Sequence, residues 1–137
     1  MLETIDLVTA GLSGVYALQN RLGNFRGKIK NKFPKISKAY EKISPTIEHF
    51  CYGYAITALG NTIQESKTLK ELILNYEPNS PVENYGLIAG GFATTLDFSW
   101  ELNQNIERKK FQPAQFLGTC AGVLTSIAIN NLEQILK

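Results

Sequence analysis

Hydrophobic positions recur at helical spacing along most of this chain, and no stretch alternates like a β-strand for more than a few residues. In residues 2–22, Ile5, Val8 and Leu12 lie three to four positions apart, which predicts a helix with one apolar face. Gly23 follows as a typical helix stop. The pattern therefore predicts an all-α fold.

Three later segments, near residues 48–63, 84–103 and 113–130, are nearly free of basic residues and rich in Gly, Ala, Ser and Thr. Ser44 as N-cap and Pro45 at the first helical position predict the start of the first of these helices. The second is expected to run from about Val82 to Arg108, and the third is expected to start at Pro113.

We therefore predict a small bundle of four to five helices, with three tightly packed Gly/Ala-rich helices at its centre. Residues 1–137 are expected to form a single domain. Within it, 1–22 is the N-terminal helix, 23–43 a basic connector and 44–137 the helical core. Residues 65–83 form a polar passage, in which a short amphipathic helix is expected up to about Tyr76, followed by a turn.

The spacing of the glycines predicts where the backbones of these helices pack most closely. Two segments contain the GxxxG spacing and a third carries two glycines seven residues apart, a device that lets helix backbones pack closely in membranes. The predicted helix-packing glycines are Gly53, Gly60, Gly86, Gly90, Gly118 and Gly122. A membrane span needs about 20 apolar residues, so these runs are of marginal length.

The net charge of +2 conceals a marked asymmetry. Residues 21–42 hold eight basic residues and one acidic residue, interleaved with aromatic and aliphatic side chains. A solvated connector and a segment held on anionic lipid both fit this pattern, and nucleic acid is not favoured because no nucleic-acid-binding fold surrounds it. The predicted basic surface comprises Arg26, Lys28, Lys30, Lys32, Lys35 and Lys38.

Charge also suggests how the chain would sit in a membrane. Under the positive-inside rule, 21–42 and 107–112 would be cytoplasmic and 64–83 would lie outside. The acidic opening does not fit a cleavable signal peptide. We therefore predict a protein that is integral to a membrane or tightly associated with one, while a soluble helical bundle remains the alternative.

Polar residues gather at one end of the three central helices if these helices are antiparallel neighbours. His49 beside Asp97 or Glu101 would form a charge-assisted pair. The alternatives are a structural histidine, a water-facing rim, and an interface aromatic at Trp100. The candidate polar cluster comprises His49, Asp97, Trp100, Glu101, Gln104 and Gln115.

Common catalytic and cofactor motifs are absent from the sequence. It contains no P-loop, dinucleotide fingerprint, nucleophile elbow or HExxH motif. With one histidine and no CxxC, we predict no metal and no cofactor, and Cys51 and Cys120 are interpreted as small buried side chains. One histidine with two carboxylates has low specificity for acid–base chemistry, so enzymatic activity stays open and is not favoured.

From about residue 48 to 130 the chain resembles the small VanZ-like membrane proteins and, more closely, the YfiM-type bacterial lipoproteins. The resemblance rests on His49-Phe50 with Gly60-Asn61, on Gly90-Gly91 leading to Trp100-Glu101, and on Ala121-Gly122. The resemblance implies a bacterial or phage envelope setting, with the protein in the bacterial inner membrane or associated with a phage or virion. One branch of the family is associated with glycopeptide resistance. The chain departs from the family by lacking a lipoprotein signal, and it has Gln112 and Gln115 where the family usually has an aspartate.

These observations lead to three functional hypotheses. The first is a small membrane-associated envelope protein that acts through helix packing or partner binding, with the polar cluster as its site. Its partners would be an anionic membrane surface and a protein partner or a second copy of the chain. The second is a structural subunit of a larger assembly, such as a virion or secretion component, with a basic partner-binding segment. The third is an envelope enzyme acting on lipid-linked substrates.

Overall fold

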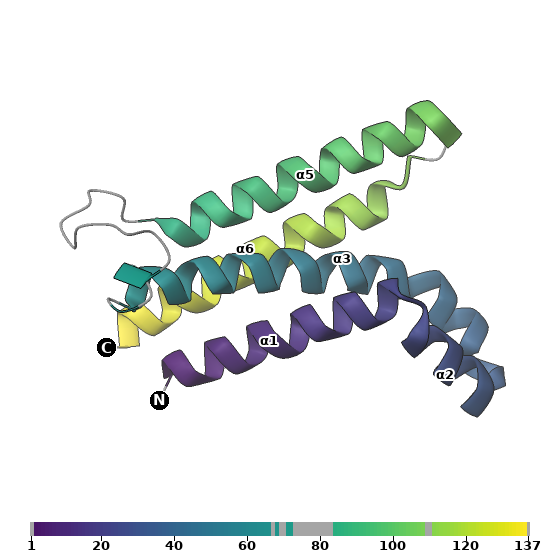
Figure 1. The fold of residues 1–137 in the computed structure, drawn as a ribbon, viewed down its shortest axis with the longest axis horizontal. Helices are drawn as coiled ribbons and strands as arrows, with labels where there is room; N and C mark the ends of the chain where they lie inside the picture. Colours follow the sequence, from purple (N-terminus) through teal and green to yellow (C-terminus); the bar gives the residue numbers. More distant parts are fainter. Residues whose placement is uncertain (1, 67, 69–70, 73–83, 109–110, 137) are drawn as a thin grey trace.

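The computed structural model describes residues 2–66, 68, 71–72, 84–108 and 111–136, and these contain helices and no strand. The helices form a bundle, as the sequence predicts (Figure 1). Their bounds are α1 (Leu2–Arg21), α2 (Asn24–Lys32), α3 (Pro34–Glu65), α5 (Tyr85–Arg108) and α6 (Pro113–Leu136).

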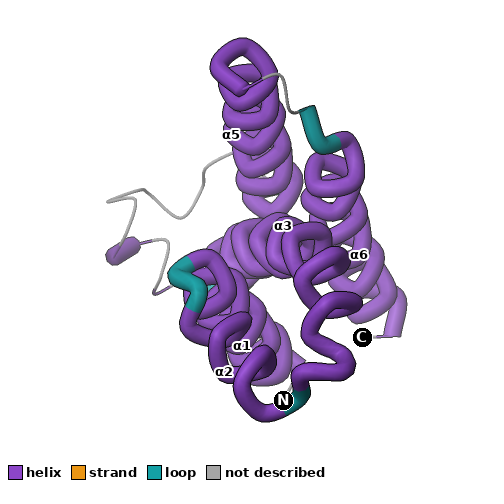
Figure 2. Tube along the Cα trace, turned by 90° about the vertical axis from the view of Figure 1, so that its right-hand side faces the viewer, coloured by secondary structure: helices purple, strands orange, loops and turns teal. Residues whose placement is uncertain are grey.

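Helix α3 forms the centre of the bundle, since α1, α2, α5 and α6 all pack against it (Figures 1 and 2). It runs antiparallel to α1 and α5 and in the same general direction as α6. One end of the molecule holds α2, the C-terminal end of α5 and the N-terminal end of α6. The end of α3 and the start of α5 lie at the other. Helix α3 therefore organises the fold, and α5 packs on its outside.

The segment 23–43, predicted to be a basic connector, is almost entirely helical. Gly23 separates α1 from α2 with a positive φ of 76°. Glycine adopts this conformation without strain, because it has no Cβ atom. Pro34 then begins α3 and separates it from α2, in agreement with the expected break.

The predicted helix start at Ser44 and Pro45 is wrong, because α3 continues through both residues. A proline within a helix lacks one backbone N–H and disturbs one turn. Contacts with neighbouring helices hold the backbone on both sides of Pro45: Asn20 of α1 donates to the carbonyl oxygen of Ser44, and Thr46 lies against Gly118 of α6. Tertiary contacts thus maintain a helix that local signals would divide.

The start of α6 at Pro113 agrees with the prediction, and α5 begins at Tyr85, close to the expected position. The turn and most of the short helix expected within 65–83, together with Lys109 and Lys110, lie outside the described residues.

Glycines set the spacing between α3 and its neighbours. A Cβ atom on Gly122 would collide with the backbone oxygen of Phe50, and one on Gly118 would lie 2.6 Å from the backbone oxygen of Thr46. On the α5 side, a Cβ on Gly60 would lie 2.7 Å from the backbone oxygen of Tyr85. Close backbone approach therefore extends along both faces of α3.

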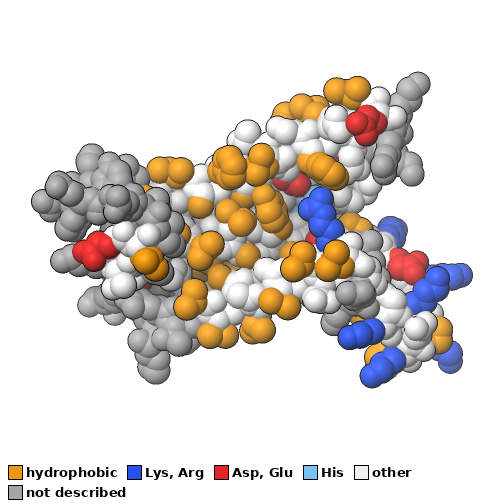
Figure 3. All heavy atoms as spheres, in the orientation of Figure 1, with side chains coloured by type: hydrophobic (Ala, Val, Ile, Leu, Met, Phe, Trp, Pro, Cys, Tyr) orange, Lys and Arg blue, Asp and Glu red, His pale blue; other side chains and the backbone are white. Residues whose placement is uncertain are grey.

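The interior and the exterior of the bundle have unusual compositions. The largest fully buried side chains are polar: Glu101, Asn20, Thr57, Thr119 and Ser44. Large hydrophobic side chains instead point outward from α1, α5 and α6, and Figure 3 shows many of them on one face. Because globular proteins usually bury such side chains, the distribution is close to the reverse of the ordinary pattern.

No helix in the described ranges has the combination of length and hydropathy needed to cross a bilayer.

Candidate functional site

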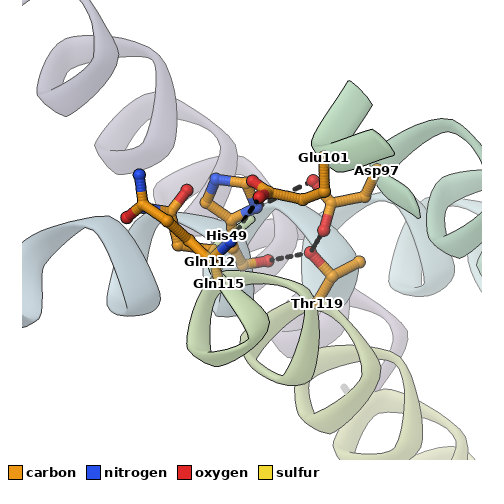
Figure 4. A network of polar contacts seen from close by, with 6 residues as sticks. All are labelled: His49, Asp97, Glu101, Gln112, Gln115 and Thr119. Carbon is orange, nitrogen blue, oxygen red and sulfur yellow. Dashed lines mark hydrogen bonds and ion pairs between the residues drawn. The ribbon is translucent and has the colours of Figure 1, made fainter. Parts of the chain in front are cut away.

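A polar network joins α3, α5 and α6 inside the bundle (Figure 4). His49 Nδ1 of α3 lies 2.8 Å from Asp97 Oδ1 of α5, with both side chains largely buried. The contact is an ion pair when the histidine is protonated. Thr119 of α6 donates to Asp97 Oδ2 at 2.7 Å, and its hydroxyl also lies 3.3 Å from the backbone oxygen of His49.

One turn further along α5, Glu101 occupies the same helix face as Asp97. Its side chain is fully buried, and Oε2 accepts a hydrogen bond from the Gln112 N–H at 3.0 Å. Oε1 has no hydrogen-bond partner among the described residues. Gln112 also accepts a hydrogen bond from Gln115, so the network extends to the first turn of α6 (Figure 4).

A second buried network connects α1 with α3. Asn20 Nδ2 donates to Glu48 Oε2 at 2.8 Å, and Tyr40 donates to Asn20 Oδ1 at 3.0 Å. The Tyr16 hydroxyl lies 3.0 Å from the Tyr40 hydroxyl, and the pKa of Tyr16 is raised by burial first and by the bond with Tyr40 second. Sequence reasoning missed Asn20 and Tyr40, because a single polar residue on a helix face does not reveal which neighbour it will meet.

An open pocket of about 510 Å³ lies between α1, α3 and α5. At this pocket, the Arg21 guanidinium carbon lies 5.3 Å from the centre of the Trp100 ring. This separation is within the range of cation–π interactions. Burial raises the pKa of Tyr52, the negative charge of Asp97 raises it further, and Arg21 partly opposes both effects. The lining consists of Gly14, Ala17, Leu18, Arg21, Glu48, His49, Tyr52, Ala55, Ile56, Leu96, Asp97 and Trp100.

The structure divides the predicted polar cluster into parts. His49, Asp97 and Glu101 lie together inside the bundle, and Gln115 joins them through Gln112. Trp100 is half exposed and belongs to the pocket. Gln104 is half-buried one turn beyond Glu101 and takes no part in the network. The sequence did not indicate two residues of this region: Arg21, which lines the pocket, and Thr119, which belongs to the polar network.

The predicted packing glycines lie at helix crossings, and the basic residues occupy the surface. Gly53, Gly60, Gly86, Gly90, Gly118 and Gly122 are all buried. Exposed lysines of α2 and the start of α3 form the basic end of the molecule: Lys28, Lys30, Lys32, Lys35 and Lys38. The side chain of Arg26 is outside the description.

Within the described part of the chain, no three His, Cys, Asp or Glu side chains converge as a set of metal ligands. Cys51 and Cys120 are free and half-buried, and burial raises the pKa of each thiol. A raised thiol pKa lowers the thiolate fraction, so neither cysteine has the properties of an activated nucleophile.

Comparison with known proteins identifies no relative: no family model, curated protein or solved structure matches this chain. The resemblance to the VanZ-like and YfiM-type proteins therefore stays a prediction based on the residues given above.

Proposed function

We propose that this protein is a membrane-associated helical bundle, whose outward hydrophobic side chains contact lipid while a polar network fixes its interior. The observation that carries this proposal is the reversed distribution of side chains. Many outward positions of α1, α5 and α6 carry leucine, isoleucine, valine or phenylalanine, whereas Glu101, Asn20 and Thr119 are fully buried.

The energetics of exposed apolar surface support an apolar covering. Leu12, Phe92 and Leu124 are exposed by 66%, 63% and 66%. Removing one such side chain from water contributes about 1.5–3 kcal/mol, and large exposed patches mark interaction sites. The interior gains its stability from close glycine packing and internal hydrogen bonds, which do not require a large apolar core.

The basic end supplies a second contact with lipid. Each lysine near an anionic surface contributes about 1 kcal/mol at moderate ionic strength. Lys28, Lys30 and Lys32 on α2 and Lys35 and Lys38 on α3 are exposed at one end of the bundle, where Figure 3 shows basic side chains gathered. An apolar flank with a basic end fits a bundle that rests at the boundary of an anionic membrane.

The second candidate is a structural subunit whose apolar exterior is covered by partner proteins. One structural feature limits this alternative. The glycine faces at Gly86, Gly90, Gly118 and Gly122 already contact the chain itself, so they are not available to pack between subunits. A partner would therefore have to bind through the large exposed side chains.

Fractionation of the expressed chain tests the proposal. We expect the protein to remain with membranes in high salt and in carbonate and to be released by detergent. Release by salt alone, as a folded helical species, would support the subunit and overturn the membrane proposal.

A matched pair of variants sharpens the test on α5. Leu87, Ile88 and Phe92 are exposed hydrophobic residues, and their combined replacement by glutamine should weaken flotation with anionic vesicles strongly. Thr95, Ser99 and Asn103 are exposed polar residues on the same helix, and their replacement by glutamine should leave flotation unchanged. Equal flotation of both variants would contradict a lipid-facing role for this surface.

A further inference from the structure

The pocket between α1, α3 and α5 has one polar end and one apolar end. At the polar end, Asn20 donates to Glu48 and the neighbouring Arg21 lies over the Trp100 ring, so the last turn of α1 is level with the His49–Asp97 pair. Since α1 and α3 are antiparallel, earlier residues of α1 meet later residues of α3. A Cβ atom on Gly14 would lie 3.9 Å from the Cβ of Ala55. Leu18, Ile56 and Leu96 complete the apolar wall.

Arg21 is the charged group of this pocket that is left for a ligand. Glu48 accepts from Asn20, and Asp97 is held by His49 and Thr119. The Arg21 side chain is exposed and makes no ion pair within the described residues. The guanidinium carbon lies over the Trp100 ring at 5.3 Å from its centre, and a guanidinium can bind a planar anion through two of its N–H donors.

The charged side chains around Arg21 favour a ligand with one negative charge over a ligand with two. A carboxylate accepts two parallel hydrogen bonds from one guanidinium. A dianionic phosphate would experience more repulsion from Glu48 and Asp97, which line the same pocket. The pocket volume of about 510 Å³ is typical of small-molecule sites, which are clefts or cavities of comparable size.

We propose that this pocket binds a single-chain carboxylate amphiphile, a fatty-acid-type ligand. Its carboxylate is bound by Arg21, and His49 lines the same pocket. Its alkyl chain lies along Leu18, Ile56 and Leu96. This inference goes beyond the membrane proposal, because it concerns a site within the bundle and holds whether lipid or a protein covers the exterior.

The single tryptophan of the chain, Trp100, reports on this site directly. We would titrate the full chain with dodecanoate, dodecanol and dodecyl phosphate and follow the tryptophan emission. The titration is done in buffer if fractionation releases the protein, and in phosphatidylcholine nanodiscs if it does not. The result is therefore independent of the outcome of the membrane test.

We expect a saturable emission change with dodecanoate, and binding at least about tenfold weaker with dodecanol, because the alcohol lacks the charge that Arg21 binds. Arg21→Gln should weaken dodecanoate binding by a similar factor and leave dodecanol binding unchanged. Lys28→Gln, which neutralises an exposed cation on α2, is the matched control and should change neither.

Filling the pocket separates specific binding from adsorption to the apolar exterior. Ala17→Phe, at the pocket wall, should abolish the saturable change, whereas Ala128→Phe, on the exposed side of α6, should not. Helical circular dichroism verifies the fold of each variant. The proposal is overturned by equal affinity for alcohol and carboxylate, by insensitivity to Arg21→Gln, or by the absence of saturation. Tighter binding of dodecyl phosphate would overturn the choice of a carboxylate.

Discussion

Thr119 of α6 contacts both of the other helices in the polar network, α3 and α5. Its hydroxyl donates to Asp97 of α5 and lies beside the backbone of His49 on α3, while its own backbone lies against Gly53. A buried carboxylate that loses its donor retains the cost of its desolvation. The network is therefore sensitive to the loss of a single hydroxyl group.

Thr119→Val tests this directly, because valine keeps the shape and removes the hydroxyl. We expect the free energy of unfolding to fall by about 1–3 kcal/mol, measured by denaturant titration. Thr125→Val is the matched control on the same helix, since the Thr125 hydroxyl bonds only the carbonyl oxygen of Ala121 within α6. Its effect should remain within about 0.5 kcal/mol. Equal losses in the two variants would contradict a special role for the Asp97 contact.

At the scale of helices, glycine decides how closely α6 approaches α3. Gly122 faces the backbone of Phe50, where a methyl group has no room unless the two helices separate. Gly91 on α5 has nothing within 4 Å of the position of a Cβ atom. The two glycines therefore predict opposite effects for the same substitution.

Gly122→Ala should destabilise the protein by about 2–3 kcal/mol, because overpacking forces backbone shifts. Gly91→Ala should stabilise it by about 0.5–1 kcal/mol through the higher helix propensity of alanine. Thermal and denaturant unfolding of both variants checks the prediction. A stabilised Gly122→Ala variant would show that the α3–α6 crossing is looser than described.

Helix periodicity and some helix ends could be predicted from the sequence, whereas the long-range partners of each helix could not. Pro113 and the apolar spacing of residues 2–22 predict α6 and α1 from local physics alone. The continuation of α3 through Pro45 depends on contacts with α1 and α6, which no local signal contains. In the same way, the four-residue spacing of Asp97 and Glu101 predicted that the two carboxylates share a helix face. The position of Arg21 over Trp100 could not be predicted, because it arises only when α1 packs on α3.

At the scale of the whole molecule, all the resolved pKa shifts among the described residues are upward. Burial raises the pKa of Tyr16, Cys51, Tyr52 and Cys120, so the folded state favours their neutral forms. Their stabilising contribution is complete below the unfolded pKa values, about 8.5 for thiols and about 10 for tyrosines, and it is lost as pH rises through the folded values.

We therefore expect the contribution of these groups to the free energy of unfolding to be independent of pH near neutrality. Above about pH 8.5 this contribution should decline. Denaturant titrations between about pH 7 and 10 measure this decline. Cys51→Ala should reduce its early part, since the thiol titrates before the tyrosines. Stability that increases with pH over this range would contradict the assigned direction.

The interior filled with hydrogen-bonded polar side chains has a calorimetric consequence. The heat-capacity change of unfolding arises from newly hydrated apolar surface and is lowered by polar surface, with a usual value of about 12–15 cal/mol/K per residue. A bundle whose large hydrophobic side chains are already outside, and whose interior holds Asn20, Thr57 and Glu101, should show a smaller value per residue in scanning calorimetry. Its stability should then vary little with temperature, and cooling should weaken it less than it weakens an ordinary globular protein.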